Sequence, residues 1–323
     1  MKLKKYSDSL GLVAVVILLY LVFSCVQPKM LTLFNIKSIL VQVSITAIAA
    51  AGMTFAMTAG VFDLSIGSIQ ALLSVVIAQA GLRYGLAAGI LAAVMVALLC
   101  GILNGLIVVK LKIQAFAATL VTMIIIRGIA ILISEGKEIP IYSMGVIKIF
   151  SSGNLLGIPV PIIIMAVVYA VSIVLYYQTE FGMRMRSVGS NPGASAVSGI
   201  KTDKYLILAF ICTAGLTVLS TIITTSQVMF GKGTIGEDFA MDVITTVVLG
   251  GTVLAGGKGN LTGTLAAAIL VAVIKNGLNI TGVNTYYQQM VIGTIFILAL
   301  IMNNIKVLRA GRWKAGGDGD AGN

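Results

Sequence analysis

The sequence has no histidine and little charge, since only 10% of its 323 residues are charged, against about 25% in an average soluble domain. Acidic residues number 11, and two of them, Asp318 and Asp320, lie at the C-terminal end. A His-based catalytic triad is therefore excluded, and a metal site lacks its commonest nitrogen ligand. The composition excludes a soluble enzyme, and an integral membrane enzyme would have no His and almost no acid clusters to work with.

Cysteine is equally scarce, and its spacing is uninformative. Cys25, Cys100 and Cys212 lie in apolar stretches and never at CxxC spacing, so they read as small hydrophobic residues. Two glycine-rich stretches resemble phosphate loops. Residues 231–236 satisfy GxGxxG without a preceding strand, and residues 250–259 fail the Walker A spacing. We therefore expect no cofactor and no bound nucleotide, and any ATP that drives this chain is hydrolysed by another polypeptide.

Apolar residues dominate what is present, at 58% of the chain, and the mean hydropathy is +1.05. A helix needs about 20 apolar residues to cross a bilayer. The sequence predicts an all-α integral membrane protein with about ten transmembrane helices. The expected spans cover residues 10–27, 38–58, 64–82, 86–109, 113–133, 158–177, 205–226, 243–256, 261–280 and 286–302.

The placement of basic residues predicts the orientation. With ten spans and an inside N-terminus, 14 of the 22 basic residues fall in inside segments, six in outside segments and two within spans. This bias fits the positive-inside rule with both termini cytoplasmic. The net charge of +11 is thus a topology signal, and no nucleic-acid partner is expected. The first apolar run is expected to be a retained span and not a cleaved signal peptide.

The two halves share a faint repeat. Asp63 begins a span and is followed 41 residues later by Asn104, and Asp242 is followed 34 residues later by Asn276. Five spans per half put the second copy upside down, which is the inverted-repeat pattern of many transporters. Glycines interrupt the chain at residues 60–67 and 256–259. Both places look like interrupted helices, which a membrane tolerates where protein or a water-filled cavity satisfies the backbone.

Polar and aromatic side chains in or beside the predicted spans are candidates for a translocation path, because amides and aromatic rings suit a neutral ligand such as a sugar. They are Phe62, Asp63, Asn104, Phe116, Asn276 and Gln288. Each such residue taken alone is more often a link between helices than part of the lining of a path. Asp63 suits the cap of a following helix better than a substrate ligand. Arg127 lies deep in a span, and we interpret it as a structural charge that contacts an acid or backbone carbonyls.

Three ordered motifs carry a family resemblance. Residues 60–68 (GVFDLSIGS), 187–200 (SVGSNPGASAVSGI) and 247–259 (VVLGGTVLAGGKG) resemble the permease subunits of ribose-type ABC sugar importers. The similarity runs from about residue 35 to residue 303. It implies a type II importer-like fold in the bacterial inner membrane. Residues 1–308 would form one transmembrane domain, and residues 309–323 are expected to be a disordered cytoplasmic tail.

The resemblance also implies partners. They are a cytoplasmic ABC ATPase subunit, a periplasmic sugar-binding protein and a second permease subunit, either identical or a close paralogue. Within the cytoplasmic loop 178–204, a short helix would fit a groove on the ATPase. The matching residues are Phe181, Gly182, Arg184, Arg186, Gly189, Asn191, Pro192, Ala194 and Gly199. Asn191-Pro192 suits a helix start, and the two arginines suit acids on a partner.

One departure and one alternative stay open. The family often has an acid two residues before the position of Asp242, whereas this chain has Ala240 there. Contact of the outer loop before Asp242 with the binding protein therefore stays open. Contact of the outer loop 134–157 with the binding protein is open as well. The resemblance specifies the family and not the sugar. The alternative function is a secondary sugar carrier coupled to an ion gradient and independent of an ATPase. Such a carrier usually needs intramembrane acids, of which Asp63 is the strong candidate.

Overall fold

The computed structural model describes the backbone of residues 3–317 and the side chains of residues 11–145 and 147–301. Helices dominate this part of the chain. They are α1 (Leu3–Val26), α2 (Leu33–Thr58), α3 (Ile66–Tyr84), α4 (Leu86–Lys110), α5 (Ala115–Ser134), α6 (Ile149–Ser152), α7 (Val160–Gln178), α8 (Glu180–Ser190), α9 (Pro192–Val197), α10 (Thr202–Val228), α11 (Phe239–Leu249), α12 (Leu261–Ile280) and α13 (Thr285–Gly317), with a 3-10 turn at Pro28–Leu31.

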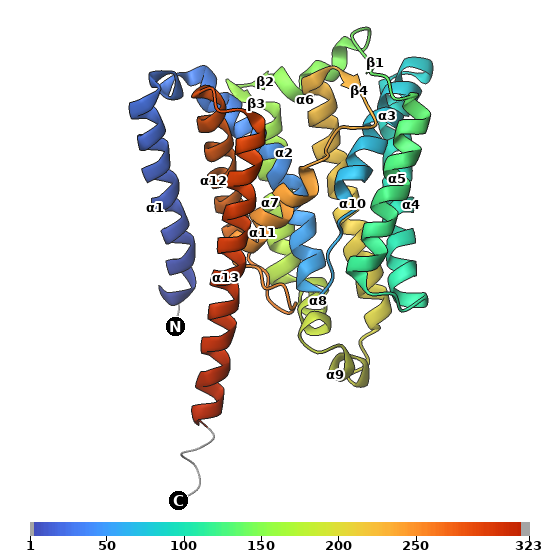
Figure 1. The fold of residues 1–323 in the computed structure, drawn as a ribbon. Coiled ribbons are helices and arrows are strands. Elements are labelled where there is room, and N and C mark those ends of the chain that lie inside the picture. The colour runs from blue at the N-terminus through green and yellow to red at the C-terminus, as the bar shows by residue number, and fades with distance from the viewer. Residues whose placement is uncertain (1–2, 318–323) are drawn as a thin grey trace, which may run out of the picture.

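A second 3-10 turn, Gly145–Lys148, and four strands of two residues each complete the described part. The strands form two antiparallel pairs, β1 (Ile139–Pro140) with β4 (Phe230–Gly231), and β2 (Asn154–Leu155) with β3 (Ile158–Pro159). All four lie at one end of the helices, together with α6, at what we call the strand face (Figure 1). At the opposite end, the α9 face, lie α8 and α9, the beginning of α1 and the end of α13 (Figure 1).

Seven described helices, α2–α5, α7, α10 and α12, are long and apolar enough to cross a membrane. Two shorter apolar stretches, Gly11–Val26 and Thr285–Ile301, coincide with expected spans, and a third, Phe239–Leu249, overlaps the expected span 243–256 only in part. The chain is therefore a multi-pass helical membrane protein. The helices are buried inside the bundle to different extents. Of the most apolar 18-residue stretch, 78% is buried in α2 and only 22% in α5.

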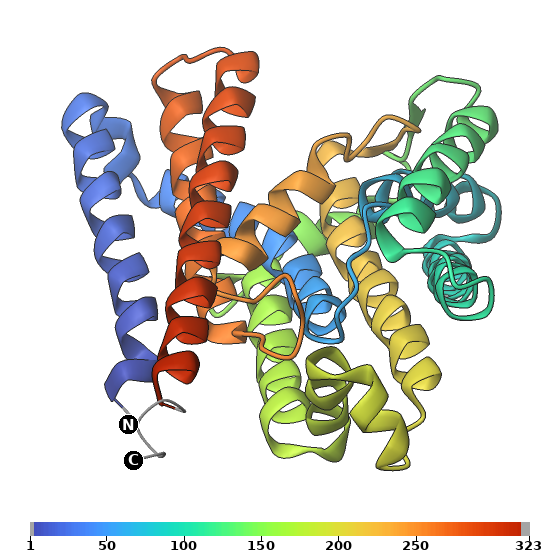
Figure 2. The same cartoon turned by 60° about the horizontal axis from the view of Figure 1, so that its bottom comes forward.

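The centre of the bundle is formed by α2 and α10, which pack against each other (Figure 2). Figure 2 also shows α1 and α13 on one side of this pair and α3–α5 on the other. Small residues allow close packing, because a Cβ on Gly105 of α4 would lie 2.8 Å from the Cα of Ile207 on α10. Close contact through small residues is the usual way in which helices associate in lipid.

Contacts between helices follow matching patterns in the two halves. α10 packs on α4 as α2 packs on α12, and α3 packs on α4 and α5 as α11 packs on α12 and α13. α10 also contacts α3 as α2 contacts α11. In these contacts, α2–α5 of the first half and α10–α13 of the second half are arranged in the same way.

Two helices are preceded by long non-helical segments. Residues 59–65 return from the α9 face to the beginning of α3, and residues 232–238 run from the strand face to the beginning of α11 (Figure 1). The predicted span 243–256 is wrong in position, because α11 begins at Phe239 and ends at Leu249. The chain is non-helical both before α11, over residues 232–238, and after it, over residues 250–260. The glycine stretch 231–236 therefore belongs largely to the non-helical segment before α11.

The C-terminal helix α13 is described as far as Gly317. The remainder of the predicted disordered tail, residues 318–323, lies outside the described residues. The disorder of the tail from residue 309 therefore stays a prediction.

Candidate functional site

Asp63 organises the first interrupted segment. Its carboxylate is fully buried and accepts hydrogen bonds from the backbone N–H of Ser65 at 2.8 Å and from the Ser65 hydroxyl at 2.5 Å. Ser65 directly precedes α3, so Asp63 fixes the turn from which that helix starts. No ion pair to Asp63 occurs among residues 11–145 and 147–301, so its charge is held by hydrogen bonds alone in this part of the chain.

Asn104 of α4 completes this polar cluster. Its amide nitrogen donates to the Asp63 Oδ2 at 3.2 Å and to the Ser65 hydroxyl at 2.9 Å, across 41 residues of sequence. Phe62, the neighbour of Asp63, packs on Phe116 at the beginning of α5, with ring centroids 6.1 Å apart. The structure thus brings together four of the six residues predicted for a translocation path, namely Phe62, Asp63, Asn104 and Phe116.

The other two predicted path residues lie elsewhere. Asn276 of α12 exchanges two hydrogen bonds of 3.0 Å with Asn35 of α2, so its amide links two helices. Both side chains are buried. Gln288 of α13 donates to the backbone carbonyl of Val283 at 2.9 Å and lines a different cavity, described below.

Arg127 of α5 supports the second interrupted segment. Its guanidinium donates to the carbonyl oxygens of Gly233 at 2.8 Å and Ile235 at 2.7 Å. These carbonyls belong to residues 232–238, which have no helical hydrogen bonds at this point. Free carbonyls are costly inside a membrane, and a buried cation is costly without partners, so each satisfies the other.

The two interrupted segments meet in the interior. A Cβ on Gly67, at the beginning of α3, would lie 2.3 Å from the carbonyl oxygen of Gly236, where no side-chain atom fits. Gly236 itself has a φ of +75°, which favours glycine. The beginning of α3 and the segment before α11 are therefore in direct backbone contact.

An ion pair that sequence reasoning did not assemble lies between α11 and α12. Asp242 directly precedes the predicted span 243–256 and Lys275 lies within the predicted span 261–280, and the structure pairs them. They line a cavity of about 220 Å³ together with Thr245 and Gln288. The signal available in the sequence was two opposite charges in neighbouring apolar segments, which would have been a reason to pair them.

On the α9 face, the loop between α7 and α10 forms a well-defined platform of two helices, α8 and α9. Asn191 ends α8 and begins α9, because its side-chain oxygen accepts from the backbone N–H of Ala194 at 2.9 Å and Pro192 occupies the first helical position. Both features are standard helix-start signals. Along α9 most side chains are exposed, and Val197 is 92% exposed.

The arginines of α8 have partners within the chain. Arg184 donates to Glu180 at 2.7 Å and to the Tyr205 hydroxyl at 3.2 Å. The Tyr205 hydroxyl, followed by Glu180, raises the pKa of Arg184 above its usual range, so the guanidinium stays charged. Arg186 points inward, where it donates to the Tyr176 carbonyl and lies over the Tyr176 ring at 4.9 Å. It therefore anchors α8 to α7, while Arg184 stays partly exposed.

Other residues of the loop 178–204 that match the family hold α8 against the bundle or lie in the turn after α9. Phe181 packs between Phe55 of α2, at 5.9 Å, and Tyr205 of α10, at 6.2 Å between ring centroids. A Cβ on Gly182 would lie 2.1 Å from the Tyr176 carbonyl oxygen. Gly199 has a φ of +80° in the turn after α9.

Gly189 lies at a junction of three segments. A Cβ at this position would lie 1.8 Å from the Thr58 carbonyl oxygen, at the end of α2, and 2.6 Å from the Gly257 nitrogen, in the loop between α11 and α12. The Gly257 N–H donates to the same Thr58 carbonyl at 2.8 Å. We call Thr58, Gly60, Gly189, Gly256 and Gly257 the glycine junction. It connects α8 to the segments that flank α3 and α11.

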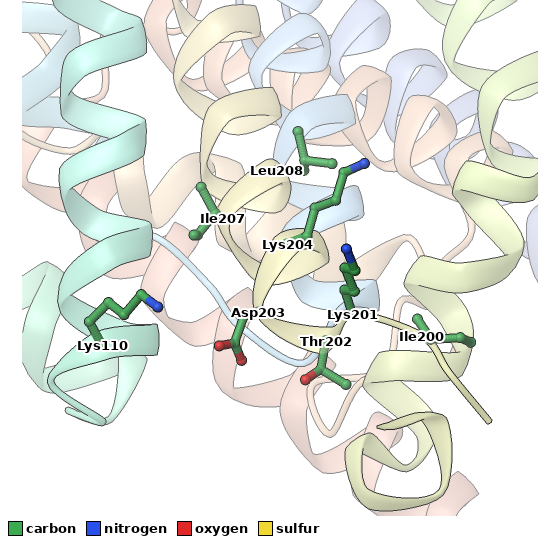
Figure 3. A pocket seen from close by; sticks show the side chains of 8 residues that line it. All are labelled: Lys110, Ile200, Lys201, Thr202, Asp203, Lys204, Ile207 and Leu208. Atoms are coloured by element: carbon green, nitrogen blue, oxygen red, sulfur yellow. The ribbon is translucent and has the colours of Figure 1, made fainter. Parts of the chain in front are cut away.

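A second, open cavity of about 610 Å³ lies beside the platform, between the end of α4 and the beginning of α10 (Figure 3). Lys110 of α4 and Asp203 of α10 stand on facing sides of it, and Lys201 and Lys204 complete its polar lining (Figure 3). The α9 face thus offers an exposed helix beside a predominantly basic recess, which suits an acidic protein surface.

The comparisons with known proteins decide the family. The family model described as "Branched-chain amino acid transport system / permease component" matches residues 35–300. The chain belongs to this permease family. The permease is 37% identical over 308 residues to the ribose import permease RbsC of Bacillus subtilis, covering 94% of each chain. It is 36% identical over 296 residues to RbsC of Haemophilus influenzae, covering 90% of this chain and 91% of the relative.

A relative with another printed substrate is also similar. The L-arabinose transport system permease AraH of Escherichia coli is 31% identical over 302 residues, covering 93% of this chain and 91% of the relative. No solved structure matches the permease.

Proposed function

We propose that this permease is the transmembrane subunit of an ABC importer that carries ribose or a related monosaccharide across the bacterial inner membrane. A periplasmic binding protein delivers the sugar, and a separate cytoplasmic ATPase subunit drives transport. The names of the relatives supply the substrate class. The observation that carries the proposal is the exposed α9, mounted on α8, whose Gly189 contacts the ends of segments from both halves.

The proposed mechanism runs from the platform to the interior. The ATPase binds α9, and Val197 supplies an apolar contact of the kind found at the centre of protein interfaces. Movement of α8 acts on Thr58 and Gly257 through the glycine junction. Thr58 ends α2 just before the segment that carries Asp63, and Gly257 lies in the loop after α11. Because the beginning of α3 contacts Gly236, both interrupted segments move together.

The proposed topology has ten spans in two inverted repeats of five, with both termini cytoplasmic. The first repeat comprises α1–α5 and the second comprises α7, α10, α11, α12 and α13. The matching helix contacts of the two halves support this division, as does the position of α8 and α9 on the same side as the beginning of α1 and the end of α13 (Figure 1). The excess of basic residues in the segments on that side supports a cytoplasmic location for it.

The assembly follows from the same orientation. The strand face, with residues 135–159, is the periplasmic surface that the binding protein contacts. A second permease subunit, either identical or a close paralogue, completes the translocation path. The apolar faces of the peripheral helices supply enough surface for such a subunit and for lipid, and Leu91, Met95 and Leu99 of α4 are examples of exposed apolar side chains.

A secondary carrier is the second candidate, because Asp63 is a fully buried carboxylate without an ion pair in the described part of the chain. Reconstitution separates the two. The permease is incorporated into vesicles with and without the ATPase subunit and the binding protein, and uptake of radiolabelled ribose is measured. The importer requires both partners and ATP. A carrier accumulates ribose under a proton or sodium gradient with the permease alone.

A further inference from the structure

The cavity of about 220 Å³ beside the Asp242–Lys275 pair has a lining unlike the apolar bundle around it. It lies between α11, α12 and the beginning of α13, close to the strand face where α12 ends and α13 begins (Figure 1). Its polar lining comprises Asp238, Asp242, Thr245, Lys275, Thr285, Gln288 and Gln289. One water occupies about 30 Å³ in the liquid, so a cavity of this size accommodates one small polar molecule.

The ion pair gives the cavity charge in a place where charge is costly. The Asp242 side chain is only 14% exposed and that of Lys275 is 33% exposed. Well-packed apolar residues usually stabilise such a position at least as well as a buried pair does, so stability alone does not account for it. The pair places a carboxylate, which accepts hydrogen bonds, next to an ammonium group, which donates three.

Thr245 supplies the observation that points to a ligand. It is fully buried, it lines the cavity, and its hydroxyl has no hydrogen-bond partner among the described residues. A buried hydroxyl without a partner carries the full cost of its lost hydration. The neighbouring Thr246 is equally buried but donates to the Asp242 carbonyl at 2.7 Å. Of these two adjacent threonines, only Thr245 has a hydroxyl that lacks a hydrogen-bond partner among the described residues.

The mouth of the cavity is polar and held in place. Gln289 donates to Asp238 at 2.6 Å, and both side chains are exposed. Gln288 is fixed by its bond to the Val283 carbonyl. A ligand entering here meets an amide and a carboxylate at the rim, the ion pair further in, and the Thr245 hydroxyl in the buried part.

We propose that this cavity is a binding site for one monosaccharide within a single permease subunit. Sugar hydroxyls donate to the Asp242 carboxylate, accept from the Lys275 ammonium, and exchange a hydrogen bond with Thr245. The inference rests on the proposed function, since it identifies where a transported sugar is held. It also assigns Thr245, Asp242 and Lys275 a role in recognising the sugar. Asp63 does not share this role, because it does not line the cavity.

The first test compares Thr245→Val with Thr246→Val in the complete reconstituted importer. Valine preserves the volume of threonine and removes the hydroxyl. We expect ribose uptake per ATP hydrolysed to fall about 3- to 10-fold in Thr245→Val, the equivalent of one lost hydrogen bond, and to change less than 2-fold in Thr246→Val. Equal uptake in the two variants overturns the binding site.

The second test fills the cavity. A Cβ on Gly293, which lines it, meets no atom within 4 Å, and the same is true of Gly215 on α10, which does not line it. We expect Gly293→Leu to block ribose uptake while the complex still assembles and hydrolyses ATP, and Gly215→Leu to transport normally. Normal uptake by Gly293→Leu shows that the cavity holds water only. Failure of the wild-type complex to import ribose contradicts the proposed function instead.

Discussion

The backbone N–H of Gly257 donates to the carbonyl oxygen of Thr58 at 2.8 Å, and Gly189 packs against the same carbonyl. This one oxygen is therefore shared by the end of α2, the loop that follows α11 and the end of α8. Thr58 and Gly257 belong to opposite halves of the chain. A movement of α8 cannot leave either half unaffected, which makes the glycine junction the proposed point of mechanical transmission.

The junction predicts a strong effect of one methyl group. Gly189→Ala places a Cβ where the Thr58 carbonyl oxygen lies, so α8 must shift away from the bundle, and overpacking of this kind costs about 1–3 kcal/mol. We expect ribose uptake to fall at least about 10-fold, because that energy opposes the transmitting arrangement. Basal ATP hydrolysis of the assembled complex should continue. The measurement is the ratio of ribose imported to ATP hydrolysed.

Gly193→Ala is the matched control for this variant. Gly193 lies on α9 four residues away, and the nearest atom to an added Cβ is the Asn191 Oδ1 at 3.5 Å, an ordinary contact. Its import ratio should equal that of the wild type. An unchanged ratio in Gly189→Ala would exclude the junction as the transmission point.

Arg127 is predicted to act on stability. Arg127→Met removes the donors to the Gly233 and Ile235 carbonyls and leaves them without these partners in a non-helical segment. We expect a loss of about 1–3 kcal/mol in the free energy of unfolding in detergent, because an unsatisfied buried acceptor costs that much. Arg83→Met, at the exposed end of α3, is the control and should have little effect. Equal stability of the two variants would refute a structural role for Arg127.

The Asn35–Asn276 pair distinguishes a link between helices from a path residue. Asn276→Leu alone leaves the buried Asn35 Oδ1 without the donor that it has in the wild type, and we expect a loss of about 1–2 kcal/mol in the free energy of unfolding. Adding Asn35→Leu should recover part of that loss, with a coupling energy of at least about 0.5 kcal/mol. Thermal unfolding of the four proteins measures the cycle. Additive losses, together with lost uptake in a stably folded Asn276→Leu, would return Asn276 to the translocation path.

The bundle was predictable from the sequence because a helix must be long and apolar to cross a bilayer, and hydropathy reports this directly. The span 261–280 agrees with α12 at both ends, and that for 86–109 with α4 to within one residue. α11 was misplaced because glycines both precede and follow it. The non-helical residues 232–238 also depend on Arg127, more than 100 residues away in sequence, which satisfies two of their carbonyls.

The candidate site was predictable residue by residue but not in its pairings. Asp63 and Asn104 were both selected as polar residues in apolar segments, yet their contact depends on the rotation of α4, which no spacing reports. Asn276 was selected on the same grounds and proves to bond Asn35. Thr245 carried no signal, since it is one of many threonines in apolar helices, and only its unpartnered hydroxyl together with its place in the cavity distinguishes it.

The most direct test of the central claim is the energy source of uptake in vesicles that contain the purified permease. With the ATPase subunit on one side and the sugar-binding protein on the other, ATP should drive accumulation of radiolabelled ribose, and omission of any of these components should abolish it. Accumulation by the permease alone under a proton gradient would contradict the claim and identify a secondary carrier.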